Sequence, residues 1–155
     1  MDTMAPLRPP TILPARHIAL TAGPAAAAAA RRQVQAAICA WNVPVESSVA
    51  ILLTSELVTN ALMHEAGDTV RLVITCAGSL LRVDVHDTSR DMPVLLDAPA
   101  EAEAGRGLLL VSSLSTNWGH YRTPMGKAVY FTLAFQADPG ASDGRSPRCE
   151  RSGVR

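Results

Sequence analysis

The most informative segment of this 155-residue sequence is Glu56-Leu57-Val58-Thr59-Asn60-Ala61-Leu62-Met63-His64. It continues an aliphatic pattern that predicts a helix over residues 45–63. An α-helix turns by about 100° per residue, so Glu56, Asn60 and His64 share one face of it. That face also carries aliphatic side chains. We therefore expect this helix to border a pocket that has polar groups on its wall.

A carboxylate and a carboxamide on the wall of a pocket lose part of their hydration. For an unpaired ion this loss costs several kcal/mol unless a partner compensates it. A metal-bound ligand is one such partner for Glu56 and Asn60. A solvated helix edge, or a pair of polar groups that satisfy each other, explains the two residues equally well. The spacing alone leaves these interpretations open.

Sequence patterns on both sides of this helix predict an α+β fold. Apolar residues at every second position indicate strands, and apolar residues at helical spacing among strong helix formers indicate helices. A two-layer sandwich follows, with a mixed, mostly antiparallel sheet covered on one face by helices. The other expected elements are an edge strand at 17–20, a helix at 25–41, a hairpin of strands near 70–74 and 81–85, a helix that begins near Gly107, and a hairpin of strands at 118–121 and 128–135.

Length and composition indicate one folded domain at residues 15–135. Hydrophobic residues make up 48% of the chain and charged residues 18%, which suits a chain that forms a core. Residues 1–14 hold four prolines, and residues 136–155 hold hardly any aliphatic side chain. Both end segments are therefore predicted to be disordered.

Net charge and hydropathy exclude several classes of partner. Fourteen basic residues balance fourteen acidic ones, so no overall field draws the protein to nucleic acid or anionic lipid. No apolar stretch approaches the ~20 residues needed to cross a bilayer. The N-terminus lacks the basic start and apolar stretch of a secretory signal. We expect a cytoplasmic protein that binds neither nucleic acid nor membranes directly.

A second candidate binding group follows the strand at 81–85, in the tripeptide Asp87-Thr88-Ser89. An aspartate at a strand end can accept a hydrogen bond from the amino group of a planar base such as adenine. Aspartate in this place also often does no more than begin a turn. The tripeptide by itself does not decide between the two.

A third candidate, Gly105-Arg106-Gly107-Leu108, ends the segment at 88–106. That segment is too long for an idle connection in a small domain, and we predict that it is a lid. Glycines let a backbone approach a phosphate closely, and Arg106 would add a positively charged guanidinium group that can bind two phosphate oxygens. A hinge or an ordinary helix start explains the glycines as well.

Taken in this order, the three motifs resemble the nucleotide-binding (Bergerat) fold of the GHKL family, which includes gyrase, the Hsp90 chaperone, histidine kinases and the mismatch-repair ATPase. Within that family, the small size, the tripeptide at Asp87 and the ending Gly126-Lys127-Ala128-Val129-Tyr130-Phe131 look like the anti-sigma-factor serine/threonine kinases of actinobacteria. The resemblance covers about residues 15–135. The alternative is an unrelated α+β domain in which the motif match is accidental.

The resemblance implies a catalytic site for ATP and Mg²⁺. By this resemblance, Asn60 coordinates the Mg²⁺ that bridges the phosphates, and Glu56 is the general base toward the attacking hydroxyl. Asp87 would hold the adenine amino group. Arg106 would neutralise charge on the transferred phosphoryl group.

The resemblance also implies further residues that bind the nucleotide. Gly105 and Gly107 would hinge the lid and present backbone N–H groups to the phosphates. Ser89 and Leu108 would lie beside them, and His64 would form part of the site wall.

Two positions weaken or qualify this picture. Broader relatives have Asp-x-Gly-x-Gly after the adenine-binding strand, whereas this chain has Asp87-Thr88-Ser89-Arg90-Asp91. Without those glycines, close backbone approach to the nucleotide is less favourable, and we expect a lower affinity. Lys127 is the chain's only lysine; a phosphate contact is conceivable, but an ordinary charge on the hairpin is expected.

The resemblance implies an ATP-dependent protein serine/threonine kinase that acts as an anti-sigma-factor-like regulator of transcription. Its partners would be a sigma factor and a small antagonist protein that it phosphorylates. An edge strand at 15–21 would also suit a homodimer, because it exposes unpaired backbone groups. The alternative is a regulatory module that binds ATP and a partner protein without phosphoryl transfer.

Overall fold

The computed structural model describes residues 13–63, 67–89 and 103–136, with the backbone alone for 103–106. Residues 1–12, 64–66, 90–102 and 137–155 lie outside the description. Most of the two predicted end segments, most of the predicted lid and His64 therefore lie outside it as well.

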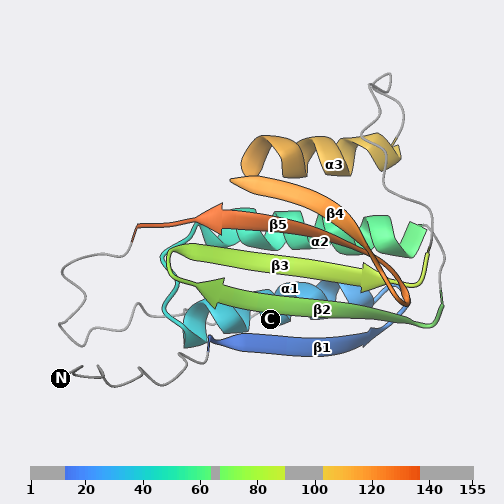
Figure 1. Ribbon diagram of the computed structural model, residues 1–155, viewed down its shortest axis with the longest axis horizontal. Helices are drawn as coiled ribbons and strands as arrows, with labels where there is room; N and C mark the ends of the chain where they lie inside the picture. The colour runs from blue at the N-terminus through green and yellow to red at the C-terminus, as the bar shows by residue number, and fades with distance from the viewer. Residues whose placement is uncertain (1–12, 64–66, 90–102, 137–155) are drawn as a thin grey trace, which may run out of the picture.

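Five strands form one sheet in the order β1-β2-β3-β5-β4, and each neighbouring pair is antiparallel. The predicted α+β two-layer sandwich is confirmed, and the described sheet is antiparallel throughout. In the view of Figure 1, α1 and α2 lie behind the sheet, and α3 lies beyond β4 and packs against α2. The elements in chain order are β1 (Ala15–Thr21), α1 (Ala26–Ala40), α2 (Ser47–Met63), β2 (Thr69–Ala77), β3 (Leu80–Asp87), α3 (Glu103–Leu114), β4 (Asn117–Thr123) and β5 (Gly126–Ala134).

The core lies between the sheet and the helices and is aliphatic with one large aromatic ring. Alternation along the strands turns every second side chain toward the helices. In β3 and β5 this face includes Val83 and Val85, which lie opposite Phe131 and Val129 in the register. From α2, Leu53 and Leu57 are buried against it. The apolar periodicity of the sequence thus predicts both layers.

Helix α2 begins two residues later than predicted, because the chain first turns through a short connection after the end of α1. Asn42 closes α1 with a left-handed φ of 51°, and the N–H of Val43 donates to the carbonyl of Ile38 at 3.0 Å. The chain then turns through residues 43–46. The first α2 hydrogen bond joins the Ala50 N–H to the carbonyl of Glu46 at 3.2 Å.

Helix α3 begins at Glu103, four residues before the predicted start at Gly107. Its first turn therefore includes Gly105, which helix propensity places outside a helix interior. Packing overrides the propensity here, because α3 lies against α2 and Gly107 allows a close approach. Both glycines therefore belong to the helix rather than to a loop before it.

The uncovered face of the sheet carries a polar cluster that joins three strands. Arg82 binds Asp84 through two hydrogen bonds of 2.7 and 2.9 Å, and the hydroxyl of Tyr121 donates to Asp84 at 2.7 Å. Arg82 also stacks over the Tyr130 ring, 4.0 Å from its centroid. Burial, together with the bond to Asp84, raises the pKa of Tyr121 to about 12. These groups satisfy one another and stabilise the sheet.

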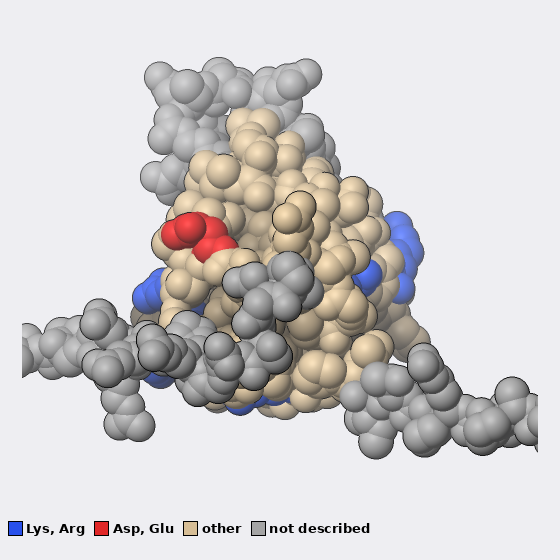
Figure 2. All heavy atoms as spheres, turned by 90° about the vertical axis from the view of Figure 1, so that its left-hand side faces the viewer, with Lys and Arg blue, Asp and Glu red and all other residues tan. Residues whose placement is uncertain are grey.

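The end of the molecule with the β2–β3 turn shows little charge. In Figure 2 the described surface there is mostly uncharged, with one acidic patch and basic side chains only toward its edges. No helix of the described chain is long and apolar enough to span a bilayer.

Candidate functional site

Three elements that carry the predicted site residues meet at one end of the sandwich. The C-terminal end of α2, the C-terminal end of β3 and the start of α3 lie at the right-hand end in Figure 1. The loop after α2 also approaches β3, because a Cβ added at Gly67 would lie 2.9 Å from Oγ1 of Thr88. The antiparallel register and the α2–α3 packing thus bring together segments far apart in the sequence.

Glu56 lies on α2, half-buried against the first turns of α3. A Cβ added at Gly107 would lie only 2.7 Å from Oε2 of Glu56. The absent side chain of Gly107 therefore leaves the space that the carboxylate occupies. The structure brings these two predicted site residues together, and it identifies close packing as a reason for glycine at this position.

Asn60 lies one helical turn beyond Glu56 and is buried, with 8% of its surface exposed. Within the described chain, its Nδ2 is buried and has no hydrogen-bond partner. Buried amides are almost always hydrogen-bonded, because an unsatisfied one costs about 1–3 kcal/mol. The solvated helix edge considered for this residue is therefore wrong. An unsatisfied amide at this place is expected where a polar ligand completes the site.

Asp87 ends β3 and is buried, with 4% of its surface exposed. Its Oδ1 accepts a hydrogen bond of 2.8 Å from the backbone N–H of Ser89. This contact is the turn-forming role that aspartate often has after a strand. Its Oδ2 lies 3.6 Å from Nζ of Lys127. Asp87 thus begins a turn and also carries a buried charge on the helix-covered side of the sheet.

Lys127 is the site residue that sequence reasoning missed. The expectation of an ordinary hairpin charge is wrong, because Lys127 is fully buried at 0% exposure and paired with Asp87. The signal was present in β5, where Lys127 alternates in phase with Val129 and Phe131 on the helix-covered face. A rule of alternation that counts only apolar residues passes over a lysine that lies in phase with them.

The structure describes the other predicted site residues in less detail. Ser89 is buried beside Asp87, and Leu108 is buried in the core at 2% exposure. Gly105 and Arg106 lie in α3, but the side chain of Arg106 is outside the description. Their roles toward a nucleotide stay predictions.

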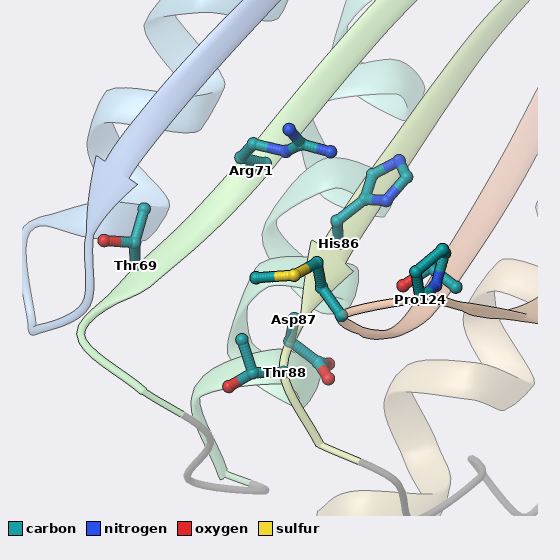
Figure 3. Close-up of a pocket in the computed structure, with 8 residues that line it drawn as sticks. Thr69, Arg71, His86, Asp87, Thr88 and Pro124 are labelled. Atoms are coloured by element: carbon teal, nitrogen blue, oxygen red, sulfur yellow. The ribbon is translucent and has the colours of Figure 1, made fainter.

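A cavity of about 540 Å³ lies beside Asp87 but opens on the uncovered face of the sheet. Figure 3 shows Arg71 and His86 at this cavity, with the carboxylate oxygens of Asp87 directed away from them. Burial lowers the pKa of His86. This cavity is lined by Thr69, Arg71, His86, Asp87, Thr88, Thr123, Pro124 and Met125.

A second cavity, of about 590 Å³, lies beside the end of α2 and is lined by Ala22, Gly23, Pro24, Ala61, Leu62, Gly67, Asp68 and Val70. Neither cavity has Glu56 or Asn60 among its described lining residues. The candidate site is therefore defined by the α2–α3 junction and the buried end of β3, and not by either cavity.

A family comparison agrees with this arrangement. The model of the histidine kinase-like ATPase domain matches residues 20–133, which is most of the chain. The chain belongs to this family. It is an ATP-binding domain of the GHKL type, the group that includes the anti-sigma-factor kinases. No curated protein matches the chain.

The residues present suit a bound nucleotide with Mg²⁺. The unsatisfied Nδ2 of Asn60 is a hydrogen-bond donor and suits an acceptor such as a phosphate oxygen, whereas the side-chain oxygen Oδ1 is the atom that could ligate Mg²⁺. The described residues hold no cluster of three or more metal-binding side chains. Mg²⁺ does not require one, because it commonly takes one or two protein ligands and completes its shell with phosphates and water. Asn60 would hold the ion, and Asp87 the base.

The approach of Gly107 to Glu56 leads to a test. Replacing Gly107 by Ala places a methyl group where the Glu56 carboxylate lies and turns that carboxylate away. We expect the turnover of bound ATP to fall on the order of 10²-fold. The melting temperature should be unchanged or higher, since Gly→Ala inside a helix contributes about 0.5–1 kcal/mol.

Ser112→Ala is the matched control, because Ser112 is exposed on the same helix. It should change neither ATP turnover nor the melting temperature by much. Full ATP turnover by the Gly107→Ala protein would show that the position of the Glu56 carboxylate does not matter.

Proposed function

We propose that this protein is an ATP-dependent protein serine/threonine kinase that acts as an anti-sigma-factor-like regulator of transcription. The observation that carries the proposal is the pair on α2: Glu56 at the α3 junction and, one turn on, Asn60 with a buried, unsatisfied amide. A binding module has no need of a carboxylate at that point. A kinase needs one, to accept the proton of the attacking hydroxyl.

In this proposal the chain's own residues position the reactants. Asp87 accepts a hydrogen bond from the adenine amino group and thereby sets how far the adenine base enters the site. Asn60 holds Mg²⁺, which when bound neutralises phosphate charge. Glu56 takes the proton from a serine or threonine hydroxyl, and Arg106, on the first turn of α3, neutralises charge on the transferred group.

The partners belong to the same proposal. A sigma factor would be bound in one nucleotide state, and a small antagonist protein would be phosphorylated in the other. The segment between β3 and α3 would change between the states. Strand β1 pairs only with β2 among the described strands. Its other edge would be available to a second copy of the chain.

One observation favours a second candidate, an ATP-binding regulatory module without phosphoryl transfer. Ser89 is buried beside Asp87 where broader relatives have glycine. A side chain there restricts the approach of backbone to nucleotide. Such a module would bind ATP and a partner protein but release no product.

Calorimetric titration with ATP and Mg²⁺ tests the proposed site directly. Wild-type protein should bind, and Asn60→Ala should weaken Mg²⁺-dependent binding by at least about tenfold. The matched control is Thr59→Ala, because the Thr59 side chain is exposed at the position just before Asn60 on α2. Equal affinity in the two variants would refute the role of Asn60. Binding without label transfer to any antagonist would favour the second candidate.

A further inference from the structure

Lys127 is the only lysine of the chain and is fully buried. Lysine side chains usually keep the ammonium group in water even where the stem is covered. A fully buried lysine therefore needs a compensating group, and Oδ2 of Asp87 lies 3.6 Å from its Nζ. We propose that Lys127 is a positioning residue that makes the nucleotide site selective for adenine. This inference rests on the proposed contact between Asp87 and the base.

The backbone holds the two charges together. Asp87 and Lys127 are direct partners in the β3–β5 register, and both side chains lie on the helix-covered face. Gly126, just before the lysine, permits the close approach of the strands. A Cβ at Gly126 would overlap the Asp87 carbonyl oxygen, so no other residue fits without backbone movement.

Both oxygens of the Asp87 carboxylate have a donor beside them. The Ser89 N–H donates to Oδ1 at 2.8 Å, and the Lys127 ammonium lies near Oδ2. These contacts fix the plane of the carboxylate. An ionised carboxylate has about four acceptor positions, so acceptor capacity remains for a ligand. The geometry thus orients Asp87 before any base arrives.

The orientation of Asp87 decides which base it can recognise. The Ser89 N–H and the Lys127 ammonium hold the carboxylate in one place. A carboxylate only accepts hydrogen bonds, so it matches the amino group at position 6 of adenine, which donates. Hypoxanthine and guanine carry a carbonyl oxygen there, and two acceptors repel each other.

The test compares binding of ATP and of ITP, in which a carbonyl replaces the adenine amino group. Wild-type protein should bind ATP at least about tenfold more tightly than ITP, the value of a hydrogen bond to a charged group. In Lys127→Met the ratio should fall to within about threefold, mainly through loss of ATP affinity. Displacement of a fluorescent nucleotide measures both affinities.

Val129→Ala is the matched control for a general loss of stability. Val129 is buried on the same strand and face but does not contact Asp87 through a charge. It should keep the wild-type ratio. A folded Lys127→Met protein with the wild-type ratio overturns the inference and leaves the proposed function intact. A wild-type protein that binds neither nucleotide overturns both.

A second measurement does not depend on a variant that folds. Protein labelled with ¹⁵N-lysine contains one labelled side chain, so its ammonium signal needs no assignment. A buried, paired ammonium exchanges slowly, so the signal should be observable at neutral pH and should shift more on addition of ATP than of ITP. Fast exchange with water, or equal shifts with both nucleotides, overturns the inference.

Discussion

If the proposed function holds, replacing Glu56 by glutamine should lower phosphoryl transfer from labelled ATP by about 10²–10⁴-fold. Glutamine keeps the size of the side chain and its place against Gly107 but cannot accept the hydroxyl proton. Because the change leaves Asn60 and Asp87 untouched, the affinity for ATP should stay within a few-fold of wild type. Single-turnover label transfer to an antagonist protein, beside calorimetric ATP binding, measures the two quantities separately.

Glu46→Gln provides the matched control. Glu46 is exposed in the connection before α2, where its carboxylate accepts a hydrogen bond of 2.9 Å from Ser48. It loses the same charge at a site remote from the α2–α3 junction, and transfer should be unchanged. Equal transfer by wild type and Glu56→Gln would remove Glu56 as the base. An equal loss in both variants would indicate an effect of net charge.

The buried pair of Asp87 and Lys127 predicts the largest effect on stability. Replacing either residue alone, as Lys127→Met or Asp87→Asn, should lower the free energy of unfolding by about 3–5 kcal/mol, because the remaining charge stays buried without it. The double variant should lose much less, since no buried charge is then left behind. Urea unfolding of the four proteins gives the coupling energy between the two positions.

The sign of this coupling energy shows whether Asp87 and Lys127 compensate each other's burial. Losses that simply add in the double variant would show that the two side chains do not compensate each other. The pair would then not account for the burial of the lysine. A large favourable coupling is expected, because both groups lie in the low-dielectric interior at 0% and 4% exposure.

Much of the fold follows from local pattern. Alternation of apolar residues predicted both hairpins, and helical spacing predicted α1 and α2 to within about two residues. The motif on α2 could also be read from the sequence, because Glu56 and Asn60 differ by one helical turn and so share a face in any helix. Asp87 was correctly placed at the end of a strand.

The start of α3 could not be predicted in this way. Two glycines in three residues argue against a helix by propensity, and the packing of α2 against α3 decides otherwise. The reason for Gly107 is a contact with Glu56, which lies 51 positions earlier in the chain. No local pattern contains that contact.

The amino-acid sequence alone determined the layers of this protein, because hydrophobic periodicity depends only on neighbouring residues. It also determined the pairing of a carboxylate and an amide on one helical turn. Only the tertiary structure decided that Asn60 has a buried amide without a partner and that Lys127 lies beside Asp87. Burial and charge pairing depend on which distant segments pack together. For Lys127, the register of β3 with β5 places the side chain beside Asp87 on the buried face.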